Sequence, residues 1–116
     1  VRMIDSERDQ LYLRLIAEAI VDIQRRIAST DLERFLIDRD EQALTAFRLL
    51  IIGENANKLS ASLKSRHAHL PWHRIVAFRN IMAHQYHRAD TNLVWEAASG
   101  LGELEAMVDA EIIGER

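Results

Sequence analysis

The sequence contains no cysteine, a single proline and only four glycines in 116 residues. Without cysteine the chain can form no disulfide, no thiolate nucleophile and no cysteine-based zinc site. No apolar run reaches the roughly 20 residues that cross a bilayer, and the first residues lack the charged-then-apolar pattern of a signal peptide. We therefore expect a soluble cytoplasmic protein. At about 100–200 residues per domain, the chain is expected to form one domain over residues 1–116.

The residues that are abundant favour an all-α fold, since alanine, leucine, isoleucine, glutamate and arginine dominate the composition. Apolar positions at helical spacing predict four main helices and a short extra helix that ends near residue 36. The main helices are expected at about 6–28, 40–65, 72–84 and 91–113. Expected N-caps are Asp5 or Ser6, Thr30, and Asp90 or Thr91. Short connections between these helices predict an antiparallel bundle, with Gly100 and Gly102 weakening the last helix or permitting close packing there.

The helix expected at 40–65 is apolar on nearly all sides at its middle. One face carries Ala43, Phe47, Leu50, Ile51 and Glu54, while Leu49 and Ile52 lie outside that face. Such a helix is either central in the bundle or covered by a partner chain. Glu54 is a carboxylate on an apolar stripe, and it is either a supporting site residue or an exposed or salt-bridged acid.

Charge is partitioned along the chain. Residues 55–89 contain six lysines and arginines, all five histidines and no acid, whereas the other 81 residues hold nine basic against eighteen acidic residues. A basic segment inside an acidic remainder suits a phosphate-bearing ligand. An equal alternative is a solvated helix face whose partner acids come from elsewhere in the fold. Because the segment lacks acids, a histidine-based metal site is the weakest hypothesis, and we expect no metal and no cofactor.

Arg79 and His84 are the candidates for chemistry. A guanidinium offers a fork of donors to phosphate oxygens, and an imidazole accepts and donates protons near neutral pH. Together these groups suffice for metal-free RNA cleavage, with His84 moving the proton and Arg79 holding the phosphate. On one straight helix the two differ by about 140°, so the helix must loosen near His84 or two copies must face each other. Asn80 lies one turn before His84 and could orient its ring. The alternative is a helix-end histidine and a surface ion pair.

Several blocks of the sequence resemble one family. The R-x4-H-x-Y pattern at 79–86, IIGENANKLS at 51–60 and LPWHRIVAFRNIMAHQY at 70–86 are similar to HepT-like proteins, the toxin branch of the HEPN superfamily. DLERFLIDRD at 31–40 and LVWEAA at 93–98 extend this resemblance over almost the whole chain. It implies an antiparallel HEPN helical bundle that works as a homodimer, and a metal-independent endoribonuclease of a type II or type VII-like toxin–antitoxin system.

The resemblance also implies roles for individual residues. Arg79 and His84 would be catalytic and Asn80 supporting, while Tyr86 would receive an inhibitory AMP from ATP through a minimal nucleotidyltransferase antitoxin (MntA-like). Further candidate contacts to RNA are His73, Arg74, Lys58 and Arg88. An ordinary surface pair is the alternative interpretation for His73 and Arg74. The alternative function is a non-catalytic HEPN helper that binds a nucleotidyltransferase or a nucleotide.

Overall fold

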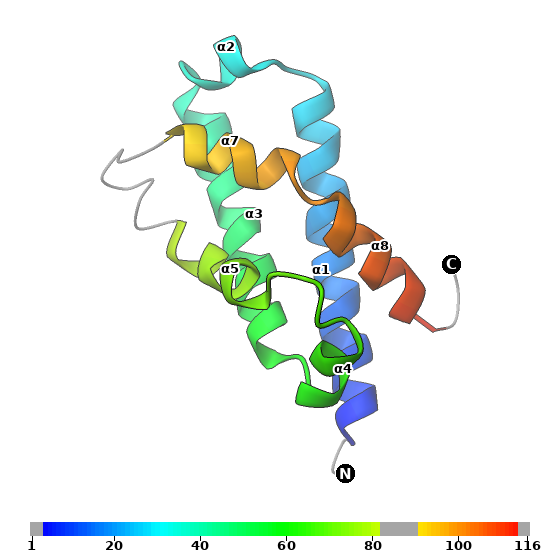
Figure 1. Ribbon diagram of the computed structural model, residues 1–116. Coiled ribbons are helices and arrows are strands. Elements are labelled where there is room, and N and C mark those ends of the chain that lie inside the picture. The colour runs from blue at the N-terminus through cyan, green and yellow to red at the C-terminus, as the bar shows by residue number, and fades with distance from the viewer. Residues whose placement is uncertain (1–3, 82–90, 114–116) are drawn as a thin grey trace.

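The computed structural model describes residues 4–81 and 91–113 of the chain. Within these residues the regular structure is helical throughout, with seven α-helices, one 3-10 helix and no strand, so the predicted all-α class is confirmed (Figure 1). The elements in order are α1 (Asp5–Ala28), α2 (Leu32–Phe35), α3 (Arg39–Lys58), α4 (Ala61–Arg66), α5 (Trp72–Val76), η1 (Ala77–Asn80), α7 (Thr91–Ser99) and α8 (Gly102–Glu111). None of these described helices is both long and apolar enough to cross a bilayer.

The long helices α1 and α3 form the centre of the bundle. They lie side by side in opposite directions, joined through α2 at one end (Figure 1). Leu13, Ile16, Ile20 and Ile23 of α1 are buried at spacings of three and four residues, which places them on one face toward α3. Helix α8 packs against α1, α5 and η1 pack against α3, and α7 packs against both long helices. Each buried aliphatic side chain contributes about 1.5–3 kcal/mol.

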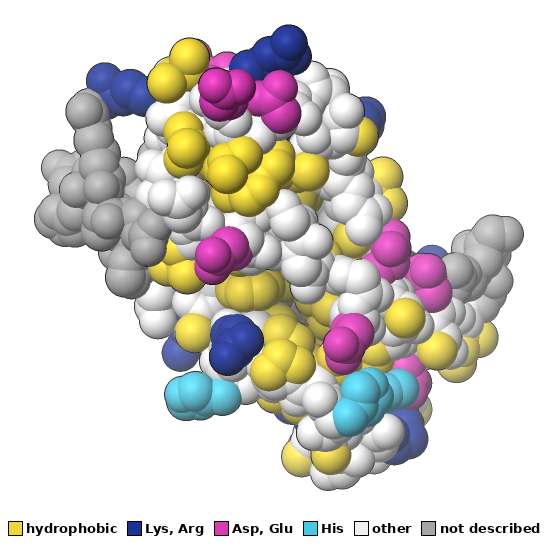
Figure 2. Space-filling model, turned by 45° about the horizontal axis from the view of Figure 1, so that its top comes forward, with side chains coloured by type: hydrophobic (Ala, Val, Ile, Leu, Met, Phe, Trp, Pro, Cys, Tyr) yellow, Lys and Arg dark blue, Asp and Glu magenta, His cyan; other side chains and the backbone are white. Residues whose placement is uncertain are grey.

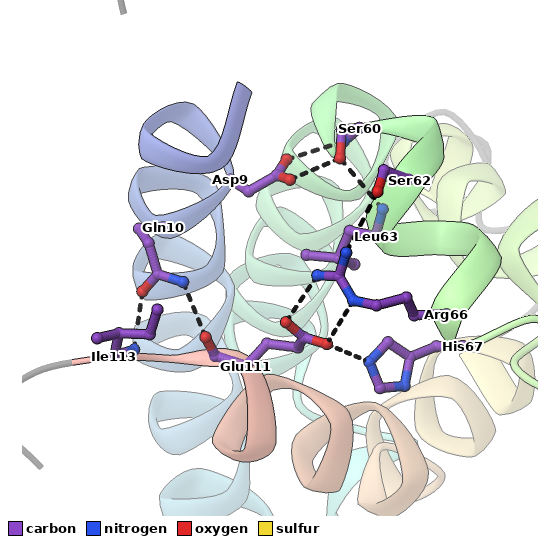
Figure 3. Close-up of polar contacts among 9 residues, drawn as sticks. All are labelled: Asp9, Gln10, Ser60, Ser62, Leu63, Arg66, His67, Glu111 and Ile113. Atoms are coloured by element: carbon purple, nitrogen blue, oxygen red, sulfur yellow. Dashed lines mark hydrogen bonds and ion pairs between the residues drawn. The ribbon is translucent and has the colours of Figure 1, made fainter. Parts of the chain in front are cut away.

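The second main helix ends earlier than the sequence predicts. Instead of continuing to residue 65, α3 ends at Lys58 and α4 begins at Ala61, with Leu59 in an extended conformation between them. The cause is a buried carboxylate on α1, because Asp9 accepts hydrogen bonds from the Ser60 backbone N at 2.8 Å and from the Ser60 hydroxyl at 2.6 Å (Figure 3). The same Ser60 hydroxyl caps α4 by accepting from the Leu63 backbone N at 3.2 Å.

The other boundaries also differ in part from expectation. The predicted last helix is divided at Gly100 and Leu101 into α7 and α8, as the two glycines in its middle suggest. The predicted caps at Asp5 or Ser6 and at Thr30 are wrong. Helix α1 starts at Asp5, whose carboxylate therefore lies in the first turn, and no side chain caps it. Helix α2 is capped by Asp31, which accepts from the Arg34 backbone N at 2.9 Å. The last turn predicted for the third helix and the cap at Asp90 lie outside the described residues.

The end of α8 is fastened to α1 and α4 by one carboxylate and its backbone. Glu111 accepts hydrogen bonds from Arg66 at 2.9 and 3.3 Å, and His67 Nε2 lies 2.6 Å from the same carboxylate (Figure 3). Gln10 of α1 donates to the Glu111 carbonyl at 2.8 Å and accepts from the Ile113 backbone N at 2.9 Å. The acid that neutralises Arg66 therefore comes from outside the basic segment.

This cluster predicts an acid-sensitive part of the stability. The hydrogen bonds from Arg66 and then from His67 lower the pKa of Glu111. A carboxyl whose pKa is lower in the folded state stabilises the fold above its unfolded pKa, and this contribution is lost as the pH falls through the folded value. We expect Glu111→Gln to be less stable than the wild type in urea at pH 7, with the difference shrinking below about pH 5. The control is Glu33→Gln, on exposed α2, and a difference that stays constant down to pH 3 would contradict the assignment.

Candidate functional site

The candidate site lies where η1 crosses α3. After Val76 the chain tightens from an α-helix to the 3-10 helix η1, which carries Arg79 and Asn80. A 3-10 helix has three residues per turn, so side chains along η1 project at about 120° intervals rather than 100°. The helix predicted over 72–84 is therefore not a regular α-helix at Ala77–Asn80, whereas the loosening expected near His84 lies outside the described residues.

Gly53 of α3 allows this crossing. A Cβ atom at Gly53 would lie 2.5 Å from the Arg79 backbone N, 3.0 Å from the Val76 carbonyl O and 3.2 Å from the Phe78 carbonyl C. No side chain fits at 2.5 Å from a backbone atom, so the two backbones approach this closely only because residue 53 is glycine. Gly53 thus fixes where the backbone of Arg79 lies.

Gly53 lies within the block IIGENANKLS at 51–60, but its role in positioning η1 was not predicted from the sequence. The available signal was an isolated glycine inside a helical apolar pattern, which indicates either a tolerated weak point or a close approach of another segment. Which of the two applies depends on residues 76–79, more than twenty positions away along the chain.

Arg79 and Asn80 are both exposed on η1. Neither side chain forms an ion pair or a hydrogen bond with any residue in the described part of the chain. The surface ion pair considered for Arg79 is therefore not seen within 4–81 and 91–113. An exposed guanidinium on a backbone that is held in place can accept an anion from solvent without first breaking another contact.

The apolar middle of α3 divides into a buried face and an open one. Leu49 and Ile52 are fully buried, whereas Phe47 is 48% exposed and Glu54 is exposed as well. Ile51 is half-buried beside them. The open face of α3 is therefore not covered by any described residue, whereas Gly53, which contacts η1, belongs to the buried side of the helix.

The other candidate RNA contacts that the structure describes are exposed side chains in different surroundings. Lys58 ends α3 with its Nζ 5.7 Å from the centre of the Tyr12 ring, on the α1 side. His73 and Arg74 project from α5, and Arg74 lines a groove together with Asn80. His84, Tyr86 and Arg88 lie outside the described residues. Among the residues that are described, no three histidine or acidic side chains gather in a way that could hold a metal ion.

Comparison with known proteins identifies the class. The family model for HepT-like ribonucleases matches residues 16–111, and the chain belongs to this family. The chain is 32% identical over 85 residues to a protein of Thermococcus cleftensis named "Probable ribonuclease HepT", covering 73% of this chain and 77% of that one. It is 26% identical over 98 residues to "Putative RNase TTE0752" of Caldanaerobacter subterraneus subsp. tengcongensis, covering 84% and 88%. No solved structure matches the chain significantly. The family and these names support ribonuclease activity on an RNA substrate.

The close approach at Gly53 predicts an unequal response to two glycine-to-alanine changes. Gly53→Ala forces a Cβ against the η1 backbone and should destabilise the fold by about 1–3 kcal/mol, as overpacking does. Gly102→Ala is the matched control because its Cβ would meet nothing within 4 Å, so its stability should be unchanged or slightly raised. Urea denaturation followed by circular dichroism measures both variants. Equal stability of the two variants would show that η1 does not press on α3 at this glycine.

Proposed function

We propose that the protein is a metal-independent endoribonuclease that acts on cytoplasmic RNA as the toxin of a toxin–antitoxin system. The observation that carries this proposal is the Arg79 side chain, which is exposed and unpaired within the described residues, on a backbone that lies against Gly53. A guanidinium that engages no other group is available to bind a phosphate and to stabilise the charge that develops on its oxygens. The R-x4-H-x-Y segment to which Arg79 belongs supplies the imidazole.

The proposed reaction uses the RNA's own 2′-hydroxyl as the nucleophile. His84 removes the proton of this hydroxyl, the 2′-oxygen bonds to phosphorus, and the bond from phosphorus to the 5′-oxygen breaks. The departing oxygen takes a proton, leaving a 2′,3′-cyclic phosphate and a 5′-hydroxyl. Arg79 binds the non-bridging oxygens throughout, and Asn80 supports the site by orienting the imidazole.

The charges near each of the other candidate residues determine its proposed role in binding RNA. Lys58 and Arg88 are proposed to contact RNA beyond the scissile phosphate because each adds positive charge within the basic segment, and His73 is proposed to contact it through its ring nitrogens. Arg74 is left out of this path because two carboxylates, Glu96 and Glu103, line the same groove and offset its attraction for phosphate. Glu54, directly after Gly53 on the open face of α3, is proposed to support the site.

We further propose that two copies pair through the open face of α3. An apolar side chain as exposed as Phe47, next to half-buried Ile51, is stabilised when a second copy covers it. As the resemblance to the HepT-like family implies, pairing is proposed to bring the two Arg79 segments toward one another. Two imidazoles would then be available, one to accept the proton of the 2′-hydroxyl and one to donate to the leaving oxygen.

The nuclease proposal is tested by cleavage of end-labelled RNA in EDTA. We expect wild-type protein to release fragments ending in 2′,3′-cyclic phosphate, and Arg79→Ala and His84→Ala each to lose at least about a hundredfold in rate. Arg34→Ala and His69→Ala, exposed residues of the same types, are the matched controls and should cleave normally. Cleavage by every variant would point to a different nuclease. If wild-type protein that carries no AMP does not cleave the RNA, the result would favour the non-catalytic helper.

The dimer proposal is tested with adjacent isoleucines of α3. Ile51→Glu places a charge on the open face and should give a folded monomer, whereas Ile52→Glu buries a charge in the core and should unfold the chain. Ile37→Glu, at a side chain that is 83% exposed away from this face, is the control and should remain dimeric. Sedimentation velocity with circular dichroism separates these outcomes, and an Ile51→Glu protein that still forms dimers contradicts the interface.

We propose that Tyr86 is the site of control by a minimal nucleotidyltransferase antitoxin. Its phenolic oxygen would attack the α-phosphate of ATP and release pyrophosphate, and the added phosphodiester would compete with RNA for Arg79. The chain contains two tyrosines, which makes Tyr12→Phe a matched control. With antitoxin and radiolabelled ATP, Tyr12→Phe should be labelled and Tyr86→Phe should not. Label on Tyr86→Phe would place the modification on another residue.

A further inference from the structure

An open groove of about 710 Å³ separates α5 and η1 from α7 and α8. Its floor is apolar, with buried Leu70, Ile75, Leu101 and Leu104 and half-buried Phe78 among the lining residues. Figure 2 shows this side of the molecule, where hydrophobic side chains lie in the hollow and charged side chains surround it. An apolar floor that remains open to solvent favours a ligand that brings apolar groups of its own.

The rim of the groove carries charges that no described residue neutralises. Glu96 of α7 and Glu103 of α8 line the groove on one wall, and both are exposed. Neither carboxylate forms an ion pair or hydrogen bond within the described residues, and the same holds for Arg74 on the opposite wall. The two acids outnumber the single cation, so the groove repels a polyphosphate strand and attracts cationic groups.

The backbone around the groove determines what form of polypeptide can enter. The described elements on both walls are helices, which offer no free strand edge with which an extended peptide could pair. An extended peptide would therefore lay unpaired N–H and C=O groups against an apolar floor, which is unfavourable because each buried group loses its hydrogen bond to water. A helix satisfies its own backbone and presents an apolar stripe at i, i+3 or i+4, and i+7.

We propose that this groove is the docking site for an amphipathic helix of a partner protein, with an apolar stripe on the floor and lysine or arginine side chains beside Glu96 and Glu103. This proposal does not depend on nuclease activity and adds a second surface to the molecule. Asn80 lines the groove, so a docked helix lies beside the residue that directly follows Arg79.

The probes are three synthetic, fluorescein-labelled 18-residue peptides. The first has a leucine stripe flanked by lysines, the second has the same stripe flanked by glutamates, and the third is a scrambled version of the first without the stripe. Fluorescence anisotropy with the full-length protein should show that the lysine peptide binds at least about tenfold more tightly than either of the others. If the scrambled peptide binds as tightly as the lysine peptide, the attraction comes from the overall negative charge of the protein and not from the groove. This result would overturn the proposal.

Reversing the charges of the groove tests whether the lysine peptide binds there. Glu96→Lys/Glu103→Lys should exchange the preference, so that the glutamate peptide binds more tightly than the lysine peptide. Glu7→Lys/Glu33→Lys changes the net charge equally at exposed positions elsewhere and should keep the wild-type preference. If both double variants lose the lysine peptide to the same extent, the groove is not its site. Circular dichroism establishes that each variant is folded.

Methyl NMR distinguishes a protein-binding groove from an RNA-binding one. The lysine peptide should shift the methyl signals of Leu101 and Leu104, which line the floor, and leave those of Val21 on the outer side of α1 unchanged. A short single-stranded RNA should leave the Leu101 and Leu104 signals in place. Movement of these two signals with RNA would assign the groove to the substrate and overturn the proposal.

Discussion

The contact of η1 with Gly53 is the constraint on which the arrangement of the surface depends. With no Cβ in the way, the backbone of residues 76–79 lies directly on α3, and the position of Arg79 follows from that contact rather than from any side-chain bond. The same contact places α5 and η1 as one wall of the groove opposite α7 and α8. Neighbouring residues of η1 therefore serve different surfaces, since Asn80 lines the groove and Arg79 does not.

A second constraint determines which charges remain available. Asp9 ends α3 by binding Ser60, so the chain turns through α4 and brings the basic segment back along the bundle. Arg66 is then neutralised by Glu111 of α8, and Lys64 lies over the ring of Trp72 with its Nζ 6.0 Å from the centre. The uniform positive charge seen in the sequence is thus reduced at the α4 end. Arg79, on η1, has no partner among the described residues and does not line the groove that Arg74 shares with Glu96 and Glu103, so its charge remains available to a phosphate.

The long helices and the family could be predicted from the sequence because both are recorded locally. Spacings of three and four residues define the buried side of α1, and the blocks around residues 51–60 and 70–86 identified a family that the comparison confirms. The break at Ser60 could not be predicted, because its cause is a carboxylate 51 residues earlier in the chain. Gly53 was missed for the same reason, since a glycine within a helix shows only that something can approach. The geometry relating Arg79 to His84 stays a prediction.

The open face of α3 and the groove are separate surfaces, and η1 lines the groove. No residue of α3 lines the groove, so a second copy seated on Phe47 and Ile51 and a helix seated on Leu101 and Leu104 would use different side chains. The η1 backbone is already in contact with α3 at Gly53, so η1 cannot move toward α3. Any displacement of η1 caused by a ligand in the groove must therefore be directed away from α3. Such a displacement carries Arg79 with it, which gives an occupant of the groove a direct physical means of changing the position of the proposed catalytic cation.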